Sequence, residues 1–291
     1  MKSNPLINDL SKGYWAMTFE GISFWAPFAN KLMSGELVKL DLQAGSLVQV
    51  FDENLRYIAP EEDGHQEVPP GSVAVISMVG ALIRYGDWCI YGADDIVKAL
   101  DEVERNENFI GAVVYFDGPG GAVNAIPPFQ AFAARKTKTY VGVYELCCSA
   151  HLFAAYTFCD YLMAENTLTS TIGSIGVVFS VVDNRKYLES LGYKFHEIYP
   201  DESEDKNLAF RLAMEGKYEM IKKEMLSPLA TKFQDAVRAA RPKLKEAPGV
   251  LTGKTFFTEQ AIEYGLTDGV GTIADGIRMV QIKSEIKSLY K

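Results

Sequence analysis

Cysteine is scarce in this chain, with four residues among 291. None of them shows the spacing of zinc ligands, and disulfide frameworks belong mostly to short secreted chains. Two of the cysteines are adjacent, and we expect all four to be reduced thiols in a cytoplasmic protein. The four residues are Cys89, Cys147, Cys148 and Cys159.

The chain also lacks a surplus of positive charge and any long apolar run. Lys and Arg number 29 against 38 Asp and Glu, which gives a formal net charge of −9. A nucleic-acid-binding surface needs a basic stripe, so we expect no nucleic-acid partner. No stretch approaches the roughly 20 apolar residues of a membrane span, and residues 1–6 do not begin a signal peptide. These absences predict a cytoplasmic protein without a transmembrane segment.

What the chain does have is an apolar fraction of 48%, enough for a sizeable core. From residue 72 onward, strand-like and helix-like runs alternate, which predicts an α/β fold with much parallel pairing. We interpret residues 1–70 as an N-terminal arm and linker, followed by a domain at 71–291. Strands are expected at 73–79, 110–116, 139–144, 161–164 and 194–199, and helices at 93–107, 122–134, 149–158, 183–192, 211–241, 258–264 and 274–289.

A glycine-rich turn, Asp117-Gly118-Pro119-Gly120-Gly121, follows the strand expected at 110–116 and leads toward a helix. Glycine permits backbone conformations and close approaches that other residues do not. The exposed N–H groups of such a turn can stabilise an oxyanion or cradle a phosphate. The run lacks the Lys-Ser/Thr ending of a P-loop and the spacing of a dinucleotide fingerprint. An ordinary tight turn is the competing interpretation.

Ser149 lies where an expected strand is followed by a helix of small residues. A nucleophile there gains from the helix dipole, and its own N–H can help to form an oxyanion hole. The simpler interpretation is that Ser149 caps the helix. Histidine is too scarce to supply an obvious base, since His65 lies in the linker and His196 in an expected strand. His151 is two helical positions after the serine, where it points away.

A lysine can replace histidine as the base for a serine nucleophile, and Lys206 is our candidate. A lysine amine has a pKa of about 10.4 in water, so it must be desolvated to act as a base at neutral pH. Four carboxylates precede Lys206 and favour its charged form instead. An ordinary surface lysine on a solvated loop is therefore the alternative. The four carboxylates are Asp201, Glu202, Glu204 and Asp205.

Taken in order, these segments resemble the signal peptide peptidase A (SppA) family of serine peptidases, which belongs to the ClpP/crotonase fold group. The family has an Asp-Ser-Pro-Gly-Gly turn, an Ala-Ser nucleophile segment, a Gly-Ser-Ile-Gly-Val block and a lysine before a Pro-Phe-like pair. Gly-X-X-(Phe/Tyr) and Ala-X-X-X-Gly-Leu-X-Asp segments follow. The ordered series covers residues 72–280 and is specific, although each block alone is not. The matching segments here are 117–121, 148–150, 173–177, 206–210, 253–256 and 261–268.

The resemblance implies a ClpP/crotonase-like domain of repeated β-β-α units, with Ser149 as nucleophile and Lys206 as general base. It implies an oxyanion hole formed by the backbone N–H groups of Gly120, Gly121 and Ala150, and no metal or cofactor. An extended polypeptide substrate and a homo-oligomer are expected. The chain looks most like the short, soluble, phage- or prophage-associated members, for which we expect capsid or scaffold processing, or turnover of membrane peptides and proteins.

The chain departs from the family pattern in the turn and after the nucleophile, and three other functions stay open. Gly118 stands where the turn usually has a serine, and Ala150-His151 stand where glycines usually follow the nucleophile. A crotonase-like acyl-CoA enzyme would share the oxyanion hole without needing the serine. A ClpP-like triad would need a histidine at 166–177, a region that has none. A catalytically inactive assembly protein on the same fold is the third alternative.

Overall fold

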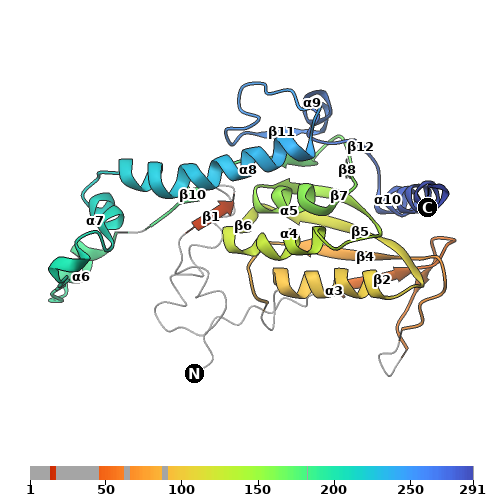
Figure 1. The fold of residues 1–291 in the computed structure, drawn as a ribbon, viewed down its shortest axis with the longest axis horizontal. Coiled ribbons are helices and arrows are strands. Elements are labelled where there is room, and N and C mark those ends of the chain that lie inside the picture. The colour runs from red at the N-terminus through yellow and green to blue at the C-terminus, as the bar shows by residue number, and fades with distance from the viewer. Residues whose placement is uncertain (1–13, 18–45, 62–65, 87–90, 182, 291) are drawn as a thin grey trace.

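Figure 1 shows the computed structural model of the chain, which describes residues 14–17, 46–61, 66–86, 91–181 and 183–290. Predictions that concern Cys89, His65 and most of residues 1–70 lie outside these residues. The elements, in chain order, are β1 (Tyr14–Met17), β2 (Val48–Phe51), β3 (Tyr57–Ile58), β4 (Ser72–Val79), α3 (Ala93–Arg105), β5 (Phe109–Gly118), β6 (Gly120–Ala122), η1 (Val123–Ala125), α4 (Pro127–Ala133), β7 (Thr139–Cys148), α5 (Ala150–Phe158), β8 (Tyr161–Ala164), β9 (Thr171–Gly173), β10 (Val178–Phe179), α6 (Arg185–Ser190), η2 (Asp201–Ser203), α7 (Leu208–Met214), η3 (Ile221–Leu226), α8 (Ser227–Ala240), β11 (Thr255–Phe257), α9 (Thr258–Tyr264), β12 (Gly269–Val270) and α10 (Ile273–Leu289).

A mostly parallel sheet forms the centre of the domain, in the order β11-β9-β7-β5-β4-β2-β3, with β8 pairing both β7 and β12. The central strands β4, β5 and β7 pair in parallel and are buried along nearly their whole length. A strand that is covered on both faces has no polar face, which explains why these sequences are continuously apolar. The α/β fold predicted from alternating strands and helices is confirmed.

Helices cover both faces of this sheet (Figure 1). On one face, α3, α4 and α5 enclose the larger core, in which neighbouring aromatic rings have centroids 5.1–6.1 Å apart. On the other face, α10 packs on β5 and β7 through Ile277. Phe158 stacks in the aromatic cluster at the end of α5, so this helix is rigidly anchored. The four rings belong to Phe129, Phe132, Tyr140 and Phe158.

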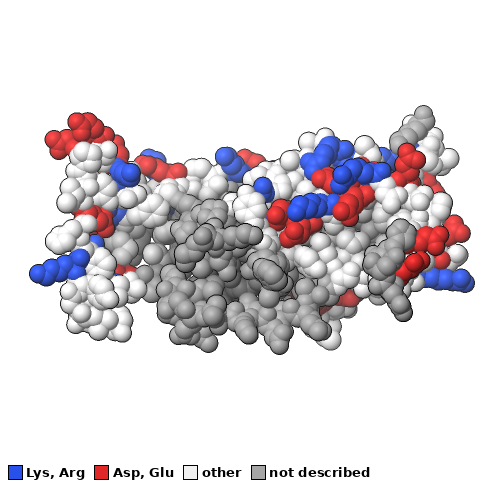
Figure 2. Space-filling model, turned by 90° about the horizontal axis from the view of Figure 1, so that it is seen from below, with Lys and Arg blue, Asp and Glu red and all other residues white. Residues whose placement is uncertain are grey.

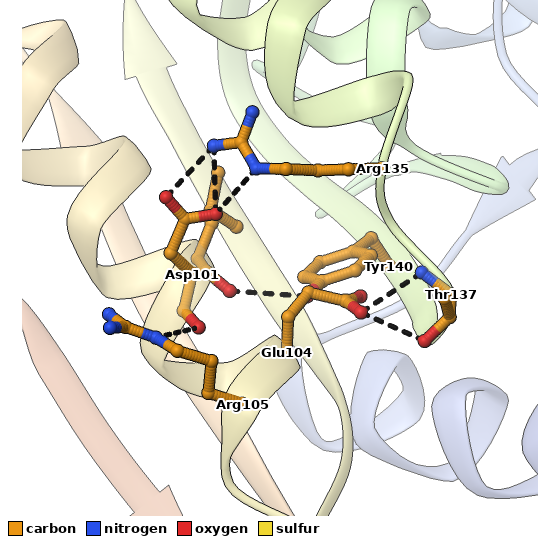
Figure 3. Close-up of polar contacts among 7 residues, drawn as sticks. Asp101, Glu104, Arg105, Arg135, Thr137 and Tyr140 are labelled. Atoms are coloured by element: carbon orange, nitrogen blue, oxygen red, sulfur yellow. Dashed lines mark hydrogen bonds and ion pairs between the residues drawn. The ribbon is translucent and has the colours of Figure 1, made fainter.

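Polar contacts tie α3 to the segment that leads into β7 (Figure 3). Glu104 accepts hydrogen bonds from the N–H groups of Lys138 and Thr137, from Thr137 Oγ1 and from Tyr140 Oη, all at 2.9–3.0 Å. Burial raises the pKa of Glu104, but these hydrogen bonds outweigh burial and lower the pKa overall. The cluster fixes where β7 starts and thereby positions the strand that ends at the candidate nucleophile.

The region after β10 departs most from the sequence prediction. The strand expected at 194–199 is wrong, because residues 193–200 form a mostly exposed irregular segment that pairs with no other strand. The helix expected at 211–241 is instead α7, the π-helical turn η3 and α8, with a break at Gly216, where φ is 79°. In Figure 1, α6 and α7 extend away from the sheet at the far end of α8; we call residues 183–218 the arm.

Part of the N-terminal region joins the central sheet. β2 pairs with β4 and β3 pairs with β2, so residues 48–58 extend the sheet of the domain expected at 71–291. β1 joins a second, three-stranded sheet in the order β10-β1-β6. The boundary at residue 70 stays a prediction, but sheet pairing does not stop there.

The face of the molecule seen in Figure 2 carries mixed charge, with Lys and Arg side chains beside Asp and Glu side chains. One such pair, Arg135 with Asp101 at 2.8 Å, links the loop before β7 to α3 (Figure 3); exposed pairs contribute at most about 1 kcal/mol each. Among the described residues, no helix has the length and apolar character needed to cross a membrane. In the same part of the chain, no group of three or more His, Cys, Asp or Glu side chains is placed to hold a metal ion.

Candidate functional site

Ser149 lies between the end of β7 and the first residue of α5, at a sharp turn of the chain. Its backbone angles are φ 56° and ψ −114°, outside the regions that a serine prefers. Its N–H donates to Gly173 O and its C=O accepts from Phe153 N–H, both at 2.9 Å, so the turn is held on both sides. Such strain costs about 1–3 kcal/mol and is concentrated at functional sites, including strand-to-helix turns that carry nucleophilic serines.

The Ser149 hydroxyl is buried and unsatisfied. The residue is 1% exposed, and its Oγ has no hydrogen-bond partner among the described residues. A buried hydroxyl without a partner costs about 1–3 kcal/mol. The side chain makes no capping hydrogen bond to α5, so the helix-cap interpretation does not account for the serine. Ser149 therefore combines an unfavourable backbone with an unused hydroxyl, and the structure provides no stabilising reason for either.

The glycine-rich turn links two strands, not a strand and a helix as expected. β5 continues to Gly118, and β6 begins at Gly120 directly after Pro119. The helix expected at 122–134 starts later, as α4, after the short helical turn η1. Gly120 has φ 114°, a conformation that is open mainly to glycine. The N–H groups of this turn therefore belong to a strand edge and not to the first turn of a helix.

The two edges of β6 have different partners. On one edge, Gly120 C=O accepts from Leu82 N–H at 2.9 Å, and Ala122 N–H donates to Leu82 O at 2.8 Å. In an extended strand the intervening residue directs its N–H and C=O to the opposite edge. Those of Gly121 therefore face β1, where Gly121 is paired with Ala16.

His151 is fully buried and contacts the glycine-rich turn, not the serine. Its Nδ1 accepts a hydrogen bond from Gly120 N–H at 3.2 Å. The acceptor role of Nδ1 requires a neutral ring with its proton on Nε2. Burial lowers the pKa of His151 from 6.5 to about 3, in agreement with a neutral imidazole. The sequence argument that His151 is not the base for Ser149 agrees with this geometry.

The two departures from the family pattern touch each other. A methyl group added to Gly118 would overlap Cε1 and Nε2 of His151, and it would also lie 2.5 Å from Gly80 O. The imidazole therefore occupies the space that a larger residue at 118 would need. In the sequence, the sign of this contact is that position 118 lacks a side chain while position 151 carries a large one.

We expect His151 to make the protein sensitive to mild acid. The unfolded chain binds a proton at this histidine below pH 6.5, whereas the folded chain binds it only near pH 3. The free energy of unfolding therefore falls as pH decreases, by about 1.4 kcal/mol per unit from this residue. Urea unfolding of wild type and His151→Asn at pH 7, 6 and 5 measures the effect. The asparagine Oδ1 replaces the Nδ1 acceptor but does not titrate, so wild type should lose about 2 kcal/mol more than the variant by pH 5. Parallel pH profiles would contradict this expectation.

The thiol next to the serine segment is inert. Cys147 is completely buried, and burial raises its pKa well above the ordinary value, with Cys148 and Cys159 adding to the rise. A thiol acts as a nucleophile through its thiolate, which this environment disfavours. Cys147 is therefore a small apolar side chain of the core.

The structure brings some of the predicted site residues together and leaves one apart. Ala150 follows Ser149 and opens α5, and the first turn of α5 contacts β6, the strand that carries Gly120 and Gly121. Ala150 N–H has no acceptor within the helix, as is usual for a first-turn residue. Lys206 lies in the exposed stretch between η2 and α7, in the arm that Figure 1 shows apart from α5. Within the described part of one chain, Lys206 makes no contact with Ser149 Oγ.

Comparison with known proteins identifies the family. Residues 131–287, which include Ser149 and Lys206, match the family model of peptidase family S49. The chain belongs to peptidase family S49. The resemblance to SppA peptidases inferred from the sequence is thereby confirmed, and the α/β domain has the ClpP/crotonase-like fold that it implied.

Two curated relatives of this S49 chain carry protease names. "Putative protease MJ0651" of Methanocaldococcus jannaschii is 26% identical over 190 residues, which are 64% of this chain and 60% of that protein. "Putative protease slr0021" of Synechocystis sp. is 29% identical over 188 residues, which are 62% of this chain and 65% of that protein. The S49 chain thus spans less than two thirds of the length of either relative.

Two solved structures are similar to the S49 chain at low sequence identity. One is described as "1510-N membrane-bound stomatin-specific protease" in complex with a substrate peptide; it is 11% identical, with a TM-score of 0.43, over 71% of this chain and 77% of that one. The other is described as a "putative enoyl-CoA hydratase/isomerase" from Acinetobacter baumannii; it is 16% identical, with a TM-score of 0.40, over 74% and 80%.

Proposed function

We propose that this S49 protein is a serine endopeptidase in which Ser149 is the nucleophile and Lys206 of a neighbouring subunit is the general base. The observation that carries the proposal is the state of Ser149. Its hydroxyl is unsatisfied and its backbone is strained, at a strand-to-helix turn beside a strand edge rich in glycine. Strain without a structural benefit is expected where a protein maintains a reactive geometry.

The reaction uses groups of the chain alone. Ser149 Oγ attacks the carbonyl carbon of the scissile peptide bond, and its proton passes to Lys206 Nζ. The developing oxyanion is stabilised by Ala150 N–H and by N–H groups of the glycine-rich turn. Lys206 returns the proton to the leaving amine, and water activated by the same lysine then hydrolyses the acyl-enzyme. Gly120 N–H contributes only when it gives up its hydrogen bond to His151.

The exposed position of Lys206 supports a base that acts between subunits. A lysine becomes a base at neutral pH only when it is desolvated, and the arm of an isolated chain leaves Lys206 in solvent. The arm and its flanks also carry large apolar side chains at high exposure, up to 92% at Ile198, which a second copy would cover. These side chains are Val181, Tyr187, Leu191, Tyr193, Phe195, Ile198, Met214 and Tyr218.

Complementation between two inactive variants tests the proposal. Ser149→Ala and Lys206→Ala are assayed separately and after mixing under conditions that exchange subunits, with an unfolded polypeptide as substrate. Each variant alone is expected to be inactive. The mixture should recover about a quarter of wild-type cleavage, because random assortment places an intact serine beside an intact lysine in that share of contacts. Lys206→Arg is the matched control, since it keeps the charge but cannot act as a base, and it should be inactive.

The outcomes separate the alternatives. Full activity of Lys206→Ala would refute the lysine as base, and a mixture that stays inactive would refute a site shared between subunits. If wild type cleaves no polypeptide in any oligomeric form, the inactive assembly protein is favoured. The resemblance to short phage- or prophage-associated members is the basis for proposing capsid or scaffold proteins, or membrane peptides, as natural substrates.

A further inference from the structure

The N-terminal strand β1 occupies a position beside the candidate active site. It is the middle strand of the sheet β10-β1-β6 and runs antiparallel to both neighbours. Figure 1 shows it as the red strand beside β6. Ala16 pairs with Gly121 and Met17 pairs with Gly120, so β1 lies along the glycines that we propose as oxyanion donors. On its other side, Trp15 pairs with Val178 of β10.

This strand position is suited to any extended peptide. Leu82 uses one edge of β6, and Gly121 directs its N–H and C=O to the other edge, where β1 lies. Main-chain pairing of this kind does not depend on sequence, so a strand edge accepts whichever extended segment reaches it. Without β1, both β6 and β10 would present unpaired backbone groups to such a segment.

A pocket of about 280 Å³ lies next to the last residue of β1. Met17 forms part of its wall, is 7% exposed, and packs with Ala81, Ala122 and Val178. The rest of the wall comes from residues 174–178, from α8 and from residues 251–253.

The pocket adjoins Ser149 through the backbone. Ser174, a wall residue, directly follows Gly173, whose C=O accepts the hydrogen bond from Ser149 N–H at 2.9 Å. The wall also includes Ile175 and Leu251, so much of it is apolar. One extended strand can therefore pair with β6 and place an apolar side chain at the wall of this pocket.

We infer that the strand position between β6 and β10 is a binding site for an extended peptide with an apolar side chain at the place of Met17, and that residues 14–17 of this chain are its resident occupant. The inference rests on the proposed peptidase function, because it identifies the bound peptide as a substrate analogue. A polypeptide substrate has to displace β1 before it can pair with β6. Its apparent affinity is then the intrinsic affinity multiplied by the fraction of molecules in which β1 has left the site.

A binding experiment in the Ser149→Ala background tests this without requiring catalysis. The probe is a fluorescent peptide with the sequence of residues 12–19, and its affinity is measured by fluorescence anisotropy. Ala16→Pro removes the N–H that β1 offers to Gly121, and proline is not tolerated in a central strand. We expect Ala16→Pro to bind the peptide at least about 10-fold more tightly than the parent, because the resident strand no longer competes.

Matched controls keep the experiment decisive. Ala16→Val retains the N–H and should bind as weakly as the parent, whereas Met17→Ser weakens the apolar anchor of β1 without altering its backbone and should tighten binding. A probe with aspartate in place of methionine should bind Ala16→Pro at least about 10-fold more weakly than the original probe. Equal affinity for Ala16→Pro and its parent, or no binding to either, would overturn the inference.

The result can be separated from that of the proposed function. Tight binding to Ala16→Pro together with absent cleavage by Ser149-containing protein would leave the peptide site standing and remove the peptidase proposal. Normal cleavage together with equal peptide affinity of Ala16→Pro and its parent would leave the peptidase proposal standing and remove the peptide site.

Discussion

Replacing Gly121 with alanine is expected to lower the free energy of unfolding by about 3 kcal/mol or more, one of the largest effects of a single methyl group in this protein. The added Cβ would overlap the backbone oxygen, carbonyl carbon and Cα of Leu82. Leu82 cannot move aside, because its N–H and C=O are both hydrogen-bonded to β6. Urea denaturation of the purified variant measures the loss, and peptidase activity should fall with it because β6 carries the proposed oxyanion donors.

Gly176→Ala is the control for this substitution. Gly176 lies in the nearby Gly173–Val177 block, and a methyl group there meets no atom within 4 Å. Its stability should stay within about 0.5 kcal/mol of wild type. A Gly121→Ala protein as stable as the Gly176→Ala protein would mean that β6 does not approach Leu82 as closely as the structure describes.

Ser149→Ala is expected to separate activity from stability. If Ser149 is the nucleophile, kcat/KM for peptide cleavage should fall by at least about 10³-fold, since loss of the attacking oxygen leaves only binding and oxyanion stabilisation. The free energy of unfolding should stay unchanged or rise by about 1 kcal/mol, because the substitution removes a buried hydroxyl that has no partner. Ser149→Gly should be at least as stable as Ser149→Ala, since glycine tolerates the positive φ.

Ser72 provides the matched control. It is also fully buried, but its Oγ donates to Pro69 O at 2.6 Å. Ser72→Ala should therefore lose about 1 kcal/mol of unfolding free energy and keep full activity. If Ser149→Ala loses stability as Ser72→Ala does, the Ser149 hydroxyl has a structural role, and retained cleavage would show that the nucleophile lies elsewhere.

The strands of the central sheet could be read directly from their composition. Apolar runs bounded by charged or small residues predict buried strands, and β4, β5, β7 and β8 lie where these runs are. Helices with a clear apolar stripe, such as α3, were predicted to within two residues. The strand expected at 194–199 was wrong, because a β-prone segment becomes a strand only where another strand is available to pair with it.

For the candidate site, too, the sequence predicted one part of the arrangement and the tertiary structure decided the rest. The order of the motifs along the chain, from the glycine-rich turn to the segment at 261–268, is a property of the sequence, and this series was enough to predict the family. The local sequence pattern did not predict that Gly120 N–H donates a hydrogen bond to His151 Nδ1, or that the imidazole of His151 fills the space beside Gly118. Both contacts join residues about 30 positions apart, and they exist because parallel strands β5 and β7 bring their carboxyl ends to the same edge of the sheet.

The sequence by itself determined the fold class, the family and the identity of the candidate nucleophile, because buried strands and short motifs depend on residues that are neighbours in the chain. Only the tertiary structure decided that Ser149 is strained and unsatisfied, that β1 lies along the candidate oxyanion strand, and that Lys206 is held in an arm away from the serine. These properties arise from contacts between distant segments, whose formation depends on how the whole sheet is assembled and on which strand edges it leaves open.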